Sequence, residues 1–207
     1  MCVHRVGIAA IFISLTVSAF AANPFLDAED DKPVSANFRG TEWNDEFPED
    51  EIPLTARIIT TRIAKMPWGA IFKIEFTDLK SRAPEEHEVP PLRYYIVTDD
   101  RIVLLNEEDN DAAAKKISVM DKPPEYEPDN VCGITIGKFS HDQKDGLWHK
   151  TIEVKGDLCI SVDEHPSGHF TKIVWKKGVG LVEFAMGYGA AREGFRLKRS
   201  TPKEAVS

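Results

Sequence analysis

Apolar and polar residues alternate with a period of two along several stretches of this chain, and the alternation restricts its fold more than any other feature. The clearest case is GAIFKIEFTD at 69–78, where every second residue from Ala70 to Phe76 is apolar. Side chains of a strand point alternately to the two faces of a sheet, so this stretch is expected to form a half-buried antiparallel strand. The β-branched stretch ARIITTRIAK at 56–65 is its expected partner across the turn MPWG.

Turn residues divide most of the remaining chain into strand-length runs. Asp99-Asp100 separates two apolar runs in LRYYIVTDDRIVLL, and VCGITIG at 131–137 has the composition of a short strand. From Leu147 onward, turn signals recur at KGD, HPSG, KKG and GYGAAREG, and they separate runs rich in Val, Ile, Phe and Trp. In NEEDNDAAAKKI at 106–117 the acids come first and the lysines last, which favours a short helix.

These patterns predict the fold class and the domain limits. We expect an all-β protein, mainly an antiparallel meander that forms an open barrel or a curved sheet, with one short helix. Residues 52–199 are expected to form this single β-rich domain. Residues 22–51 are rich in acids and are interrupted by prolines, which predicts an acidic flexible segment, and residues 200–207 are expected to be a flexible tail.

The first 21 residues predict that the protein is exported. Arg5 is followed by an apolar run at 6–20, and Ala19 and Ala21 form an A-x-A cleavage site, as in a secretory signal peptide. The run is shorter than the roughly 20 apolar residues of a membrane helix. We expect a periplasmic or secreted protein with no transmembrane segment after cleavage. The formal net charge of −8 argues against a nucleic-acid partner.

Export would leave two of the three cysteines, Cys132 and Cys159, in the mature chain. In an oxidising compartment, an even pair is most simply a disulfide. Such a bridge would stabilise the fold by about 3–4 kcal/mol in the chain-entropy model. The alternative is two separate thiols. Because the spacing is not C-x-x-C, neither a redox motif nor a zinc ribbon is expected.

A group of histidines and one acid near two predicted turns is the pattern that could form a chemical site. If three-residue loops join the strands of LWHKTIEVKGDLCISVDEHPSGHFTKIVW, His149 lies opposite Asp163 and His165 opposite His169. These four side chains would then share one face and could bind zinc or another divalent metal. A two-residue loop would instead place Glu164 opposite His149. The alternative is that these histidines stand in solvent at the hairpin ends.

The glycine-rich stretch VWKKGVGLVEFAMGYGA at 174–190 is expected to turn the chain and not to bind a phosphate. Gly178 and Gly180 are followed by Glu183 where a dinucleotide fingerprint would have its third glycine, and the chain continues as a strand. The part WKKGVGLVEF at 175–184 resembles the closing hairpin of uncharacterised exported bacterial proteins, often lipoproteins, that are built as curved antiparallel sheets. The resemblance implies a β fold and a bacterial envelope origin, and it implies no catalytic residues.

Three functions remain open from the sequence. The first is a non-enzymatic exported protein that binds an envelope or extracellular protein, or a small apolar ligand held against the curved sheet. Trp68, Tyr94 and Trp175 are its candidate contact residues, and no G-x-S-x-G or H-E-x-x-H motif occurs. The second is a metal-binding protein or metal-dependent hydrolase that uses the histidines and the acid named above. The third is a secreted enzyme inhibitor whose acidic segment at 22–51 mimics a substrate.

Overall fold

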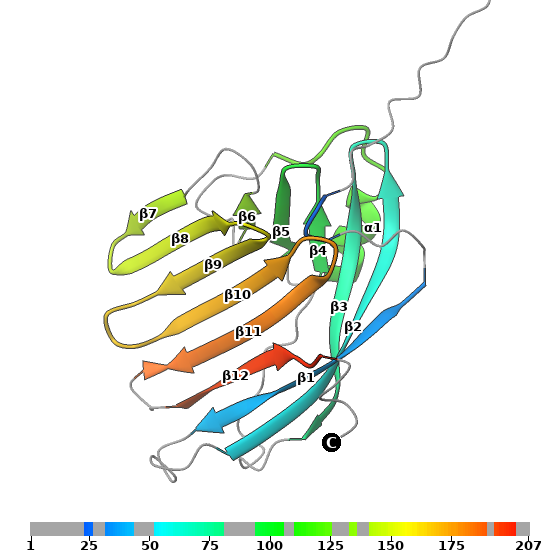
Figure 1. Ribbon diagram of the computed structural model, residues 1–207. Helices are drawn as coiled ribbons and strands as arrows, with labels where there is room; N and C mark the ends of the chain where they lie inside the picture. The colour runs from blue at the N-terminus through cyan, green and yellow to red at the C-terminus, as the bar shows by residue number, and fades with distance from the viewer. Residues whose placement is uncertain are drawn as a thin grey trace, which may run out of the picture.

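The computed structural model describes residues 23–26, 32–43, 52–80, 94–105, 110–125, 133–135, 141–189 and 193–201. These residues form twelve strands and one helix (Figure 1). The strands are β1 (Val34–Trp43), β2 (Ile52–Met66), β3 (Gly69–Lys80), β4 (Tyr94–Val97), β5 (Arg101–Leu105), β6 (Gly133–Thr135), β7 (His141–Asp145), β8 (Trp148–Lys155), β9 (Leu158–Glu164), β10 (Phe170–Lys176), β11 (Gly180–Tyr188) and β12 (Glu193–Arg199). The helix is α1 (Asn110–Ile117).

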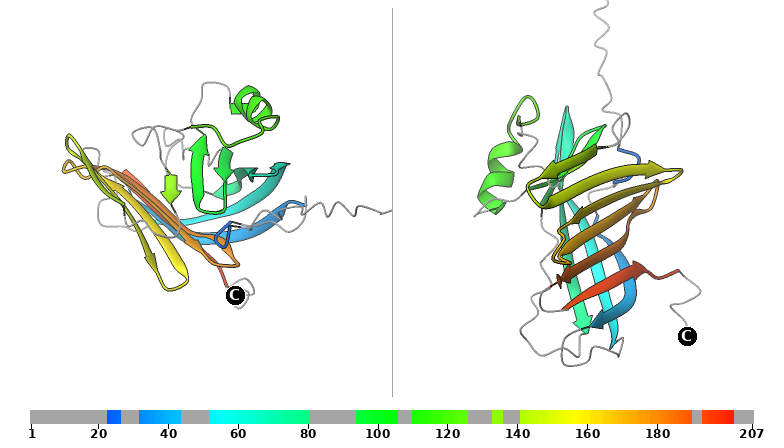
Figure 2. Two further views of the ribbon diagram at one scale, coloured as in Figure 1. Left: turned by 90° about the horizontal axis from the view of Figure 1, so that it is seen from above. Right: turned by 90° about the vertical axis from the view of Figure 1, so that its left-hand side faces the viewer.

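All these strands belong to one sheet, in the order β6-β5-β4-β3-β2-β1-β12-β11-β10-β9-β8-β7. Every pair of neighbouring strands is antiparallel. Figure 2 shows the sheet curling into a half-barrel, with β4, β5 and β6 turned back over its concave side, and β6 comes near β9. The expected all-β fold, an antiparallel curved sheet with one short helix, is confirmed.

The two hairpins predicted in the first half of the chain form at the expected turns. The turn at Pro67-Trp68 joins β2 to β3, and the turn at Asp99-Asp100 joins β4 to β5. In the second turn, Thr98 N donates to the Arg101 carbonyl oxygen over 2.9 Å. The apolar positions that alternation placed on one face of β3 all contact the main hydrophobic core. The period of two therefore predicted correctly which face of this strand is buried.

The concave face of the curled sheet carries the main hydrophobic core, which is packed between the two halves of the sheet. Trp175 of β10 is fully buried there, and the Tyr95 ring of β4 meets it edge-on with centroids 5.6 Å apart. Phe72 and Phe184, from opposite halves of the sheet, belong to the same core. We call this the inner face of the sheet and the opposite side the outer face.

A second, smaller core lies on the outer face of β3, β4 and β5, where α1 covers the sheet (Figure 2). Ile71 and Tyr94 pack there against Ala114 and Ile117 of the helix. The Tyr94 hydroxyl also donates to the Asp111 carboxylate, and this hydrogen bond raises the pKa of Tyr94. β4 and β5 are thus buried on both faces along most of their length, which explains their continuous apolar runs.

The three aromatic residues considered as partner contacts are not on an open surface. Trp175 is 0% exposed and Tyr94 is 8% exposed, so both belong to the cores. Trp68 is half-buried, and its Nε1 donates to the Met120 carbonyl oxygen over 2.7 Å. Tyr94 and Trp175 are therefore core residues, and their assignment as exposed contact residues is wrong, whereas a contact role for Trp68 stays a prediction.

The segment 22–51, expected to be flexible, contributes a central strand. β1 lies between β2 and β12 and pairs with both. Its alternation is hidden in the sequence because Gly40 occupies an inner-face position, where a Cβ would lie 1.6 Å from the Arg196 carbonyl oxygen. The β domain therefore begins before residue 52, and the prediction of a flexible segment is wrong for the part of 22–51 that the structure describes.

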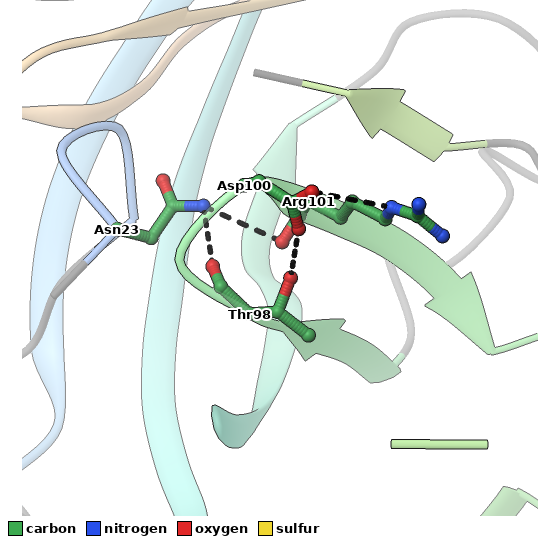
Figure 3. A network of polar contacts seen from close by, with 4 residues as sticks. All are labelled: Asn23, Thr98, Asp100 and Arg101. Carbon is green, nitrogen blue, oxygen red and sulfur yellow. Dashed lines mark hydrogen bonds and ion pairs between the residues drawn. The ribbon is translucent and has the colours of Figure 1, made fainter. Parts of the chain in front are cut away.

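The residues just before β1 also pack onto the domain (Figure 3). Asn23 is 1% exposed, and its Nδ2 donates to the carbonyl oxygens of Thr98 and Arg101 at 2.9 and 3.4 Å. Its Oδ1 accepts hydrogen bonds from the backbone N atoms of Phe25 and Leu26 at 3.0 and 3.3 Å. Phe25 is 0% exposed and belongs to the main core. Asn23 thus ties this segment to the β4–β5 turn.

The two ends of the chain lie mostly outside the described residues. The predicted signal peptide, residues 1–21, is one such part, and so are residues 202–207 of the predicted tail. Ser200, the first residue of that tail, is held in place, because its backbone N donates to the Asn37 carbonyl oxygen over 2.8 Å. Within the described ranges, no helix has the length and apolar character needed to cross a membrane.

Candidate functional site

Four aromatic and imidazole rings form a row across the ends of β8, β9, β10 and β11. The ring centroids are 5.1 Å apart between Trp148 and His165, 6.3 Å between His165 and His169, and 6.2 Å between His169 and Tyr188. Each contact joins neighbouring strands, whose ends lie side by side on the left of Figure 1. We call these four residues the ring row.

The two end members of the ring row are open to solvent. Trp148 is 45% exposed and Tyr188 is 38% exposed, and Leu147, beside Trp148, is 65% exposed. Figure 2 shows that the part of the sheet from β7 to β12 extends beyond β4, β5 and β6, which cover the core only further along the strands. Grouped exposed apolar side chains mark interaction sites more often than isolated ones do. The ring row is therefore our candidate binding surface.

The turn between β9 and β10 fixes the two imidazoles of the ring row. The Ser167 hydroxyl lies 2.7 Å from Nδ1 of His165 and 2.7 Å from Nδ1 of His169. Ser167 N donates to Nδ1 of His165 over 3.1 Å, so this nitrogen acts as an acceptor in that contact. Gly168 has a φ of 90°, which a residue with a side chain rarely adopts. The contacts of the turn use the Nδ1 atoms and leave both Nε2 atoms for other partners.

The register of β8 and β9 differs from the predicted one by one residue. A two-residue turn at Gly156-Asp157 joins the strands, so His149 lies opposite Glu164, with 3.4 Å between Nδ1 and Oε1. The prediction that His149 lies opposite Asp163 is therefore wrong. Glycine at the first central position, here with a φ of 63°, is typical of a two-residue hairpin turn. The alternative two-residue loop considered from the sequence is the one that forms.

The register decides which of the predicted metal ligands meet. His165 N donates to the His169 carbonyl oxygen over 2.8 Å, so the pairing of these two histidines is confirmed. His149 points to the outer face with Glu164, whereas Asp163 lies opposite Lys150, 3.8 Å away, on the inner face. Across the described ranges, no three His, Cys, Asp or Glu side chains are grouped so that they could hold a metal ion. The predicted four-residue zinc site is not assembled there.

The predicted disulfide joins a described residue to one outside the described part. Cys159 in β9 is 0% exposed and forms no disulfide among the described residues. Burial raises the pKa of its thiol to about 12, so the thiol is protonated at neutral pH and is a poor nucleophile. Cys132, its predicted partner, immediately precedes β6 and lies outside the described residues. The bridge therefore stays a prediction.

The glycine-rich stretch turns the chain, as expected. Gly178 and Gly180 have φ values of 67° and 89°, and they lie at the β10–β11 turn and at the start of β11.

No protein-family model, curated protein or solved structure matches this chain.

Sequence reasoning found two of the four members of the ring row. It placed His165 opposite His169 because it assigned a three-residue loop to HPSG. It missed Trp148, at the start of β8, and Tyr188, at the end of β11. The correct register could have identified both residues. Extending the β8–β9 pairing by one residue places Trp148 opposite His165, and extending the β10–β11 pairing by one residue places Tyr188 opposite His169.

Proposed function

We propose that this chain is an exported, non-enzymatic β-sheet protein that binds an envelope or extracellular protein through the ring row. The observation that carries the proposal is the exposure of Trp148 and Tyr188 at the two ends of a row of four rings. Tryptophan and tyrosine are enriched among the residues that supply most of the binding energy at protein interfaces. The imidazoles between them add hydrogen-bonding groups to the same surface.

A protein partner fits this surface better than a small apolar ligand does. Small-molecule sites are concave and enclose most of the ligand. The inner face between the two halves of the sheet is filled by the side chains of the main core, including Trp175 and Phe184. The ring row instead lies beyond the core, on the part of the sheet that extends past β4, β5 and β6 (Figure 2). An open row of rings can pack against the surface of a protein, whereas it cannot enclose a small ligand.

Two features support a binding role in preference to a catalytic one. The Cys159 thiol is buried in the core with its pKa raised to about 12. The Ser167 hydroxyl lies within hydrogen-bond reach of two imidazoles, but Ser167 is exposed on a turn. Acyl transfer relies on a site that excludes water and aims donors at the developing charge. We therefore assign Ser167 the role of holding the two histidine rings.

The proposal places the protein in the envelope or outside the cell. The pattern of residues 1–21 and the resemblance of WKKGVGLVEF to exported bacterial proteins support this placement. Cell fractionation and N-terminal sequencing of the mature protein test it directly. Mature protein that begins near Ala22 and is recovered from the periplasm or the medium is the expected result. An uncleaved chain in the cytoplasm would contradict export.

Site-specific photo-crosslinking in cells tests the binding surface. A photoreactive residue is placed at position 148 or 188, and a matched control at Val119, which is 81% exposed and lies at the end of the α1 region. We expect a defined crosslinked protein from positions 148 and 188 that the control does not give. Crosslinks that are equal at all three positions would contradict the proposal.

The affinity for the crosslinked protein gives the second measurement. Truncation of a central aromatic contact costs about 2 kcal/mol or more, so Trp148→Ala, Tyr188→Ala should weaken binding by roughly 30-fold. The matched control is Ile63→Ala, which removes a 44% exposed side chain elsewhere on the sheet. Equal affinities of the control and the double variant would contradict a role for the ring row.

A further inference from the structure

The outer face of the sheet carries a basic surface although the chain has a formal net charge of −8. Arg39 of β1 lies directly opposite Lys198 of β12, and Arg57 of β2 lies opposite Asn37. These residues alternate with Phe38 and other core residues, so their side chains point away from the core. Like charges placed directly across two strands destabilise a sheet. An anion bound near Arg39 and Lys198 would therefore reduce the repulsion between them.

Neither Arg39 nor Lys198 forms an ion pair within the described part of the chain. The nearest acid in register with Lys198 is Glu183, but its carboxylate contacts Lys172 at 2.9 Å and Arg196 at 3.9 Å. The negative charge on this part of the outer face is thus engaged by other basic residues. Among the described residues, no carboxylate pairs with Arg39 or Lys198, and both side chains are exposed.

A groove opens on the outer face beside Arg39. Its volume is about 560 Å³. The polar residues that line it are Asn37, Arg39, Thr55, Arg57, Asp78 and Ser200. They come from β1, β2 and β3 and from the residue that follows β12. Two arginines on adjacent strands thus line one groove, and Lys198 lies opposite Arg39.

The one acid named in the groove does not block it. Arg57 Nε lies 3.6 Å from Asp78 Oδ2, a contact that leaves the two terminal guanidinium nitrogens of Arg57 for a ligand. Asp78 has a φ of 53°, and it is the one residue other than glycine with a positive φ among the described residues. Strained backbone of this kind is concentrated at functional sites. Asp78 lies at the irregularity in the β2–β3 pairing opposite Thr55 and Arg57, and its carboxylate contacts Arg57 there.

The remaining polar groups of the groove can donate hydrogen bonds. The Ser200 Oγ is buried, and no group of the described residues forms a hydrogen bond with it. Thr55 and Asn37 offer a hydroxyl and a carboxamide on the same lining. A groove with two arginines, further donors and one carboxylate that is already paired is complementary to an oxyanion with several acceptor oxygens.

We propose that this groove binds a phosphate group, held mainly by Arg39 and Arg57. The planar guanidinium group matches two oxygens of one phosphate at a time, and this makes arginine the preferred residue for such sites. A phosphate between Arg39 and Lys198 would also relieve the repulsion between them. The group could belong to a soluble phosphate compound or to a lipid headgroup, which present the same chemistry. The proposal is independent of the ring row, which lies at the ends of other strands.

The site is tested by titrating the isotope-labelled protein with inorganic phosphate at constant ionic strength. NMR chemical shifts report the binding. We expect saturable shifts of the groove residues. Arg39→Gln and Arg57→Gln should each weaken binding about tenfold or more, because each removes a charge-assisted hydrogen-bond donor. The matched control is Arg196→Gln, which removes an equally exposed charge from the same face outside the groove, and it should leave the affinity within about twofold. Equal losses in all three variants would overturn the groove as the site.

Vesicle binding then separates the two sources of the phosphate group. Vesicles with anionic phospholipid and vesicles of zwitterionic phospholipid alone are compared for the wild type, Arg39→Gln and Arg196→Gln. Binding of anionic vesicles that is lost only in Arg39→Gln identifies a lipid headgroup. Saturable binding of free phosphate without vesicle binding identifies a soluble compound. The absence of both, with all variants unfolding at the temperature of the wild type, would overturn the proposal.

Discussion

The Asn23 carboxamide donates to the Thr98 carbonyl oxygen over 2.9 Å, and this bond joins residues 75 positions apart. Replacing Asn23 with alanine would remove this donor from the part-buried Thr98 carbonyl oxygen and the acceptor for the backbone N atoms of Phe25 and Leu26. We expect Asn23→Ala to lower the free energy of unfolding by about 1–3 kcal/mol. Urea denaturation measures the loss, and Asp121→Ala, at an exposed position, is the control. A loss no larger than that of the control would show that Asn23 does not anchor the segment.

Structural features that depend on neighbouring residues could be predicted from the sequence, whereas features that depend on distant strands could not. The alternation in β3 and the turn at Asp99-Asp100 are local signals, and both were confirmed because each depends on a few neighbouring residues. β1 was missed because its surroundings are acidic and Gly40 interrupts its apolar face. Its place between β2 and β12 depends on a partner strand more than 150 residues away, which no local pattern contains.

The candidate site was predicted only in part for a related reason. The pairing of His165 with His169 follows from one loop length, and that length was predicted correctly. The position of His149 depends on the length of a second loop, and a change of one residue moves a side chain to the other face. Trp148 joined the ring row through the same one-residue difference. A surface that spans four strands therefore requires every register to be known.

The Cys159 thiol makes the stability of the reduced protein depend on pH. Its pKa is raised from the ordinary 9.0 to about 12 in the folded state, so the folded state holds the proton more tightly than the unfolded state does. The stabilisation is fully present below pH 9 and is lost as the pH rises toward 12. We expect the free energy of unfolding to fall by about 1.4 kcal/mol for each pH unit in this window.

Comparison with Cys159→Ala isolates this contribution, because lysines and tyrosines titrate in the same range in both proteins. The difference between the two unfolding free energies, measured in a reducing buffer, should shrink steadily above pH 9. A difference that stays constant up to pH 11 would show that the thiol titrates equally in both states.

We expect the protein, once oxidised, to form the Cys132–Cys159 disulfide. β6 begins directly after Cys132 and comes near β9, which carries Cys159. Each thiol would lose one hydrogen to a disulfide oxidant, so the oxidised protein is two hydrogens lighter. Mass spectrometry after alkylation without reductant should show neither of these two cysteines modified, and reduction should lower the unfolding free energy by about 3–4 kcal/mol. Alkylation of both cysteines in the unreduced exported protein would contradict the bridge.

The arrangement of His149, Asp163, His165 and His169 predicts that these four residues do not form a stoichiometric zinc site. His149 faces the outer side with Glu164, and Asp163 is engaged by Lys150. His165 and His169 then offer two ligands, fewer than the three protein ligands of a catalytic zinc site. The metal content of the protein, purified without chelator or added histidines, should be the same as that of His165→Ala, His169→Ala. The double variant should also unfold close to the wild type, because both imidazoles lie outside the core. Zinc bound at one ion per chain and lost in the double variant would instead establish a metal site and direct the search toward hydrolase activity.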